Sequence, residues 1–132
     1  YAFAFKKLGW NSETVLLDEE HAFVANEGKL FVPQNFDLSY RGEISLREAL
    51  GQSRNIPAVS TLEKVGTEEF RTFLESFGVS FLVENDGQQG LSLALGAGEM
   101  RLFDLAMLTL LLAREGKDFT PCTREPCFSQ EG

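Results

Sequence analysis

The sequence contains few of the side chains on which metal centres and self-contained hydrolase triads depend. Its 132 residues include two cysteines, Cys122 and Cys127, and one histidine, His21. These side chains cannot supply the four ligands of a structural zinc site at the usual spacing. His21 follows two glutamates and has no G-x-S-x-G motif around it, so we interpret it as a surface residue. We therefore expect no metal ion and no cofactor.

Basic residues and long apolar runs are also scarce. Twelve lysines and arginines stand against 20 aspartates and glutamates, which gives a net charge of -8. A chain of this charge repels phosphate backbones and anionic lipid surfaces, so we expect no nucleic-acid partner. The longest apolar run, residues 105–113, is interrupted by Thr109 and is shorter than the roughly 20 residues that span a bilayer. We expect no membrane span in this chain.

The two ends of the sequence lead to different predictions. The chain starts with Tyr1 and has no basic region ahead of residues 1–5, so we expect a start within a longer protein and no signal peptide. From Lys117 onward the charged, turn-prone composition predicts a surface loop or a connection. Within it, Cys122 and Cys127 form either a disulfide, if the compartment is oxidising, or two reduced thiols.

The remaining composition is that of a packed, mainly helical chain. Hydrophobic residues make up 43% of the sequence, and its 12 phenylalanines recur between turn signals, so much aromatic surface must be buried. Residues 2–8 predict the end of a helix that Gly9 stops. Residues 10–33 predict an irregular or extended stretch. In it, residues 29–32 predict a short strand, which Pro33 restricts to the edge of a sheet.

The clearest helix signal begins at Ser45. Ser45 and Glu48 have the spacing of a capping box, in which each side chain accepts the other residue's backbone N–H. We therefore predict a helix that begins at Leu46 and ends around Gln52. Ile44 and Ala49 occupy the positions of a hydrophobic staple across its first turn.

Two more helices are predicted on the C-terminal side of this one. After a turn at residues 53–55, Asn55 can cap a helix that has Pro57 in its first turn and Gly66 as its stop. Thr67 can cap the next helix, which Gly78 would end. Its apolar residues fall on one face at i, i+3, i+4 and i+7: Phe70, Phe73, Leu74 and Phe77.

The segment after these helices is glycine-rich and then strongly apolar. Residues 88–98 contain Gly96-Ala97-Gly98, which is a weak phosphate-loop signal and is better explained as a tight turn. Residues 100–115 carry leucine, phenylalanine and methionine on nearly every face, so we predict a central, buried helix there. The expected fold class is mainly α with a few short extended segments.

Ser53 and Asn55 are the candidate catalytic pair. A turn between two capped helices can hold a hydroxyl and a carboxamide rigidly toward a shared cleft, as proton relay and amide recognition require. The alternative is that Asn55 only caps its helix and Ser53 only closes the local turn. An S-x-N triplet by itself does not decide between these two interpretations.

The surrounding motifs favour the catalytic interpretation, because in order they resemble one family. Residues 45–50 (SLREAL), 52–59 (QSRNIPAV) and 90–99 (GLSLALGAGE) are similar to the transpeptidase domain of bifunctional class A penicillin-binding proteins, most closely the penicillin-binding protein 1C branch. The resemblance spans residues 1–116, with residues 117–132 as a loop or connection, so residues 1–132 are expected to be a partial transpeptidase domain. It implies the helical lobe of the α/β serine β-lactamase/D,D-transpeptidase fold, incomplete in this chain.

The resemblance also implies a function and a set of roles. The family cross-links peptidoglycan stem peptides through an acyl-serine intermediate and binds β-lactams, at the periplasmic face of the inner membrane. By resemblance Ser53 is a catalytic proton relay, Asn55 binds the substrate's amide, and Arg54 occupies a variable position. Of the family signature S-x-x-K, S-D-N and K-T-G, only the second has a counterpart here. We therefore expect this chain to be inactive alone and to need the remaining segments of the domain.

Two other functions remain open on the sequence. The first is a non-catalytic helical interaction module, or a degenerate penicillin-binding homologue, that keeps the scaffold without the chemistry. The second, which is weaker, is a β-lactam hydrolase or sensor of the same fold. The sequence shows neither a water-activating group nor a signalling region for that second function.

Overall fold

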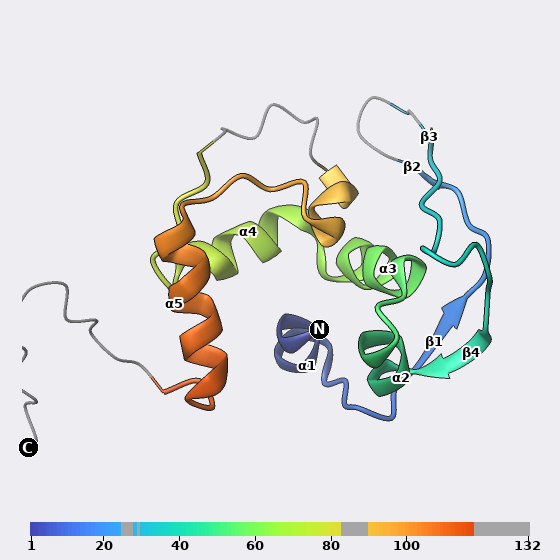
Figure 1. Ribbon diagram of the computed structural model, residues 1–132, viewed down its shortest axis with the longest axis horizontal. Coiled ribbons are helices and arrows are strands. Elements are labelled where there is room, and N and C mark those ends of the chain that lie inside the picture. Colours follow the sequence, from blue (N-terminus) through green and yellow to red (C-terminus); the bar gives the residue numbers. More distant parts are fainter. Residues whose placement is uncertain (25–27, 29, 83–89, 118–132) are drawn as a thin grey trace, which may run out of the picture.

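The structure is a computed structural model that describes residues 1–24, 28, 30–82 and 90–117. The elements in chain order are α1 (Ala2–Leu8), β1 (Val15–Asp18), β2 (Phe23–Val24), β3 (Leu30–Phe31), β4 (Gly42–Ser45), α2 (Leu46–Gly51), α3 (Asn55–Val65), α4 (Thr67–Glu75), the 3-10 helix η2 (Gly90–Leu95) and α5 (Leu102–Ala113). Figure 1 shows the helices in an arc from α5 through α4 and α3 to α2, with α1 inside the arc and two small antiparallel strand pairs at one side. The expectations for residues 118–132, including Cys122 and Cys127, lie outside the described residues.

Two antiparallel pairs of strands form the extended part. In the longer pair, β1 and β4, Asp18 lies opposite Gly42. In the shorter pair, β2 and β3, Phe23 lies opposite Phe31. Strand β3 has one neighbour and ends two residues before Pro33, as the sequence predicted for an edge strand.

The predicted capping box is confirmed at the start of α2. The Ser45 hydroxyl accepts the backbone N–H of Glu48 at 3.2 Å, and Glu48 Oε2 accepts the backbone N–H of Ser45 at 2.9 Å. Ile44 and Ala49 are both buried in one apolar cluster, which is the predicted staple. This cap fixes where α2 begins and therefore where the turn at its other end lies.

Helix α3 lies at the centre of the larger apolar cluster. Its inner face buries Ile56, Val59, Leu62 and Val65. The same cluster contains Ala4 of α1, Phe23 of β2, and Leu91 and Leu93 of η2. Each of the valine, leucine, isoleucine and phenylalanine side chains stabilises the fold by about 1.5–3 kcal/mol on burial. Segments far apart in the sequence are thereby fixed around α3.

Helices α1 and α3 end at the glycines that the sequence predicts, whereas both ends of α4 need a correction. Gly9 stops α1 with a φ of 67°, and Gly66 separates α3 from α4 with a φ of 83°. The predicted cap at Thr67 is wrong, because Gly66 occupies the cap position and Thr67 is the first helical residue. Helix α4 ends at Glu75, earlier than predicted, and a turn leads from there to Gly78.

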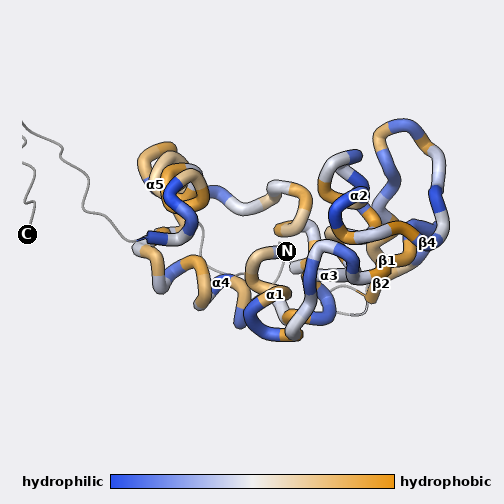
Figure 2. Tube along the Cα trace, turned by 90° about the horizontal axis from the view of Figure 1, so that it is seen from below, coloured by the Kyte–Doolittle hydropathy of each residue, from blue (hydrophilic) through white to orange (hydrophobic). Residues whose placement is uncertain are grey.

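The prediction that the apolar helix after residue 100 is central is wrong within the described part of the chain. Helix α5 lies at the periphery in Figure 1 and is coloured mostly hydrophobic in Figure 2. Leu102 is 81% exposed and Leu112 is 71% exposed, and Asp104 is the buried residue of this helix. Among the described residues, no helix has the length and apolar character needed to cross a bilayer.

Candidate active site

The turn between α2 and α3 has a strained backbone. The amide of Ser53 donates to the carbonyl of Leu50 at 3.1 Å, and the amide of Arg54 donates to that of Ala49 at 2.9 Å. Ser53 has a φ of 55°, in the left-handed region that favours glycine. A non-glycine residue there costs about 1–3 kcal/mol, so contacts elsewhere must hold the turn in place.

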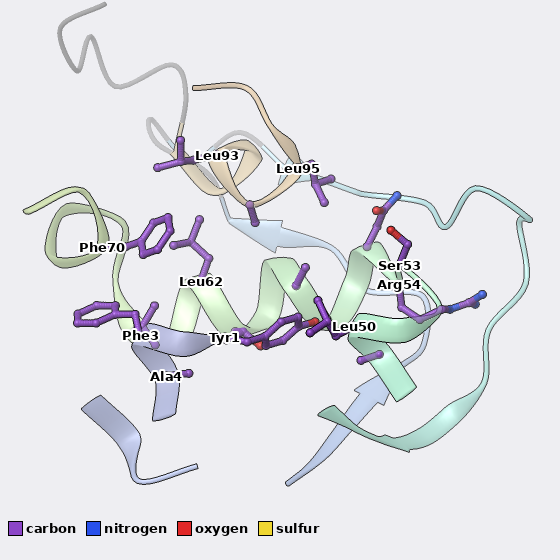
Figure 3. Close-up of a pocket in the computed structure, with 16 residues that line it drawn as sticks. Tyr1, Phe3, Ala4, Leu50, Ser53, Arg54, Leu62, Phe70, Leu93 and Leu95 are labelled. Atoms are coloured by element: carbon purple, nitrogen blue, oxygen red, sulfur yellow. The ribbon is translucent and has the colours of Figure 1, made fainter. Parts of the chain in front are cut away.

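Ser53 and Asn55 both line one pocket. The pocket has a volume of about 460 Å³ and runs between α1, α3, α4 and η2. Figure 3 shows Phe3 and Phe70 toward one end of it and Ser53 toward the other, near Leu95. The Arg54 side chain points away from the other labelled side chains of the pocket. The turn therefore presents a hydroxyl on one side and a cation on the other.

The two candidate side chains differ in how they are engaged. The Ser53 side chain is exposed, and no hydrogen bond occupies its hydroxyl within the described residues. Asn55 donates from its side-chain amide to the carbonyl of Gln34 at 2.7 Å. The Ser53 hydroxyl is thus available to a ligand, whereas part of the Asn55 amide already holds a neighbouring segment.

The prediction that Asn55 caps α3 is wrong. Arg54 occupies the N-cap position, and Asn55 is the first residue of the helix. The backbone N–H of Asn55 is satisfied by Oδ1 of Asn35, at 2.8 Å. A side chain 20 residues away therefore does the capping, and this leaves the Asn55 side chain at the pocket.

Sequence reasoning missed the importance of Arg54. This side chain is 5% exposed, and its Nε donates to Oδ2 of the fully buried Asp18 at 2.8 Å. Its Nη1 donates to both carboxylate oxygens of Asp37, at 3.1 and 3.0 Å. Its Nη2 donates to the carbonyl of Ser39. The only sequence signal was a basic residue in a well-capped turn, which does not show where its partners lie.

Asp18 and Asn35 extend this network. Oδ1 of Asp18 accepts the side-chain amide of Asn35 at 2.7 Å, and Oδ2 of Asp18 also accepts the backbone N–H of Arg41 at 3.0 Å. Asn35 Nδ2 donates further to the carbonyl of Ser39 at 2.9 Å. We call Asp18, Asn35, Asp37 and Arg54 the Arg54 network. It fixes the end of β1 and residues 35–39 to the turn.

Hydrogen bonds within the network favour the charged forms of Asp37 and Arg54. The hydroxyl and the backbone N–H of Ser39, followed by the Arg54 guanidinium, lower the pKa of Asp37 to about 2. Burial disfavours the charged form of Arg54, but hydrogen bonds to Asp37 and Asp18 outweigh it and raise the pKa of Arg54. At the pocket, burial and then the charge of Asp18 raise the pKa of Tyr1 to about 12, so its phenol is no base at neutral pH.

The other candidates from the sequence have structural explanations. His21 is exposed and packs edge-on against Phe23, with ring centroids 4.5 Å apart. Gly96 has a φ of 94°, which confirms the tight turn, and a Cβ on Gly98 would lie 2.5 Å from Leu93. Within the described residues, no group of histidine, cysteine, aspartate or glutamate side chains is arranged to hold a metal ion.

Comparison with known proteins identifies one kind of relative. No family model matches the chain. It is 40% identical over 85 residues to penicillin-binding protein 1C of Escherichia coli, an alignment that covers 64% of this chain and 11% of that protein. It is 31% identical over 108 residues to penicillin-binding protein 1B of Vibrio cholerae, covering 82% of this chain and 14% of that protein.

A solved structure agrees with these relatives. The crystal structure of penicillin-binding protein 1A from Haemophilus influenzae superposes with a TM-score of 0.60 at 29% identity, over 73% of this chain and 14% of that one. This match confirms the predicted fold class, the incomplete helical lobe of the transpeptidase fold. The chain spans between 7% and 14% of the length of the first three curated relatives. The chain therefore belongs to the penicillin-binding proteins, of which it matches a segment.

Proposed function

We propose that this chain is the part of a serine D,D-transpeptidase that carries the second active-site motif. The protein would cross-link peptidoglycan stem peptides and bind β-lactams. The observation that carries the proposal is the joint position of Ser53 and Asn55 on one pocket, with the Ser53 hydroxyl free among the described residues. The relatives named penicillin-binding proteins support it.

The proposed chemistry assigns one role to each of the two residues. A serine outside this chain attacks a peptide carbonyl carbon, the C–N bond breaks, and the serine's proton passes to the departing amine. An incoming amine then attacks the acyl-serine ester, loses a proton, and releases the serine. Ser53 relays the proton in both steps, because a hydroxyl donates and accepts at once. Asn55 hydrogen-bonds the amide of the bound peptide, since a carboxamide matches a peptide group.

The partners and the location follow from the same proposal. Stem peptides and β-lactams are the ligands of the whole protein, and the remaining segments of the domain are the partners of this chain. We propose an extracytoplasmic location, at the periplasmic face of the inner membrane, with the anchor supplied by a segment outside this chain.

Labelling with a fluorescent penicillin tests the proposal in the full-length gene product. We expect the wild type to be labelled, and Ser53→Ala to lower the rate of transpeptidation by about 10²–10⁴-fold, as loss of a proton relay does. Ser60→Ala, which changes a serine of α3 that does not line the pocket, is the matched control and should leave both readouts unchanged. Absence of label on the wild-type protein would contradict the proposal.

The isolated chain provides the second arm. Because it contains neither S-x-x-K nor K-T-G, we expect no covalent label on residues 1–132 alone. The sequence of the gene on both sides separates an enzyme from a non-catalytic module: an enzyme has S-x-x-K shortly before Tyr1 and K-T-G after Gly132. If both motifs are missing and the full-length protein is not labelled, the non-catalytic module is the better description.

A further inference from the structure

We propose that Arg54 is a positioning residue: through the Arg54 network it holds Ser53 and Asn55 in the geometry that acylation and transfer require. This inference rests on the proposed function for its catalytic part. It assigns a role to Arg54 at the middle position of the S-x-N motif. Because the Arg54 side chain points away from the other labelled side chains of the pocket, it touches no reacting group. Arg54 would act through its two neighbours in the turn.

The first argument is that the guanidinium connects segments that are far apart in the sequence. Its acceptors are Asp18 at the end of β1, Asp37, and the carbonyl of Ser39. The partners lie 36, 17 and 15 residues away along the chain. These bonds use all three nitrogens of the guanidinium, so the side chain has one permitted orientation. A residue with such a side chain fixes its own backbone and that of the residues bonded to it.

The second argument is that the network reaches the backbone of Asn55 directly. Asn35 donates to Asp18, the acceptor of Arg54 Nε, and accepts the N–H of Asn55. The carbonyl of Gln34, the residue before Asn35, accepts the Asn55 side-chain amide at 2.7 Å. Loss of the Arg54–Asp18 pair would therefore loosen one of the two acceptors that hold Asn35, and with it the contacts at residues 34 and 35 that orient Asn55.

The third argument is the strained backbone of Ser53. Its φ of 55° is unfavourable for a residue with a Cβ, so the turn would relax if its flanks were not held. On the N-terminal side the capped α2 holds it, and on the C-terminal side the next residue is Arg54, which is buried in its network. Relaxation of this turn would withdraw the Ser53 hydroxyl from the pocket.

Arg54→Lys is the central variant in the test, because lysine keeps the charge but cannot form the same set of fixed, forked bonds. Arg54→Met is a second variant that also removes the charge. Arg47→Met is the control for loss of an exposed ion pair, since Arg47 bonds Glu13 at 2.8 Å on the same α2 side of the molecule. Arg101→Met is the control for loss of stability, since it deprives the buried Asp104 of its cation far from the turn along the chain.

Two readouts are needed on the full-length protein, well below the melting temperature of every variant. The first is the second-order rate constant of acylation by a fluorescent penicillin. The second is hydrogen–deuterium exchange of peptides that cover residues 49–57, which contain the turn. Peptides that cover residues 58–65, the rest of α3, provide the comparison. We expect Arg54→Lys to slow acylation by about tenfold or more and to speed exchange selectively in residues 49–57. Neither control should do both.

The outcomes separate this inference from the proposed function. If Arg54→Lys is acylated like the wild type, or if exchange in residues 49–57 is unchanged, Arg54 does not position the turn for catalysis. If Arg101→Met slows acylation as much as Arg54→Lys at equal loss of melting temperature, general stability explains the effect and the inference fails. If the wild type itself is not acylated, the proposed function fails with the catalytic part of this inference, and exchange alone decides whether Arg54 holds the turn.

Discussion

The guanidinium of Arg54 and the carboxylate of Asp18 form a buried ion pair, Nε to Oδ2 at 2.8 Å, with side chains 5% and 0% exposed. The two residues belong to different elements and are separated by 36 positions. Buried charges of this kind are costly to desolvate and are tolerated only when hydrogen bonds satisfy them. Asp18 and Arg54 meet that condition through Asn35, Arg41, Asp37 and Ser39.

Removing one partner of this pair should therefore be far more damaging than removing both. We expect Asp18→Asn to lower the free energy of unfolding by about 3–5 kcal/mol, because it leaves the Arg54 charge buried without its closest counter-charge. The double variant Asp18→Leu with Arg54→Met should recover part of this loss, because no uncompensated buried charge remains. Urea unfolding followed by circular dichroism measures both.

The matched control for this pair is the exposed ion pair between Glu13 and Arg47 of α2. Glu13→Gln removes the negative charge that faces Arg47, in a pair whose side chains are 69% and 72% exposed. Exposed pairs contribute about 0–1 kcal/mol, so we expect little change. Equal losses in the free energy of unfolding for Asp18→Asn and Glu13→Gln would show that the buried pair contributes no more to stability than the exposed one.

Acid should weaken the fold through two carboxylates. The folded-state pKa of Asp37 is lowered to about 2, chiefly by the Ser39 hydroxyl, and the capping box lowers that of Glu48. Both pKa values lie below those of the unfolded chain, about 3.9 for aspartate and 4.3 for glutamate. Their contributions to stability are therefore complete above the unfolded values and are lost as pH falls through the folded ones.

We expect the urea midpoint to fall steadily between about pH 5 and pH 2. A carbon-detected NMR titration should place the Asp37 midpoint near 2, and Ser39→Ala should raise it toward the ordinary value, because the variant removes the donor 2.6 Å from Oδ2. Glu48→Gln should flatten part of the acid decline. An Asp37 midpoint that already lies at the ordinary value in the wild type would contradict this account.

Ser53 should show a conflict between stability and function. Its φ of 55° suits glycine, so we expect Ser53→Gly to leave the free energy of unfolding unchanged or to raise it by up to about 1 kcal/mol. The same change removes the proposed proton relay and should lower transpeptidation about 10²–10⁴-fold, as Ser53→Ala does. Thermal unfolding and a cross-linking assay on the full-length protein measure the two effects separately.

Glu115→Gly is the control for the backbone effect, since Glu115 has a φ of 58° at the end of α5. It should match Ser53→Gly in stability and leave transpeptidation unchanged. A large loss of stability on Ser53→Gly would mean that the serine side chain itself holds the turn, which the proposed role does not include.

The features that the sequence predicted well depend on residues that are close together in the chain. The capping box at Ser45, the stop at Gly9 and the break at Gly66 each involve residues within one helical turn, so their spacing identifies them. The turn at residues 53–55 followed from these boundaries. The turn also led us to expect Ser53 and Asn55 at a shared cleft; both line one pocket, and their catalytic roles stay predictions.

What the sequence could not predict depends on distant residues. Asn55 was expected to cap α3, but Asn35 takes that place from 20 residues away. Arg54 was given a variable position by resemblance, and the sequence did not reveal its role because its partners, Asp18 and Asp37, have no recognisable spacing from it. The helix after residue 100 was expected to be central, since an all-round apolar helix requires apolar cover, and the described residues do not provide it.

The exposed apolar surface of α5 leads to the last prediction. Leu102, Phe103, Leu105, Leu110 and Leu112 are all at least 43% exposed along this helix. A contiguous apolar patch of this kind binds hydrophobic dyes and promotes association. We therefore expect the isolated chain to bind ANS and to self-associate with rising concentration. The double variant Leu102→Lys with Leu112→Lys should reduce both effects while helix content, measured by circular dichroism, is kept.

Leu30→Lys distinguishes a patch from scattered exposure. Leu30 is 70% exposed in β3, which is similar to Leu112, but it does not belong to the α5 surface. Single exposed leucines are common on folded proteins and have little effect on solubility. Leu30→Lys should therefore leave dye binding and association nearly unchanged. If the α5 variant and the β3 variant reduce association equally, the general gain of positive charge on a chain of net charge -8 explains the result, and α5 is not the interacting surface.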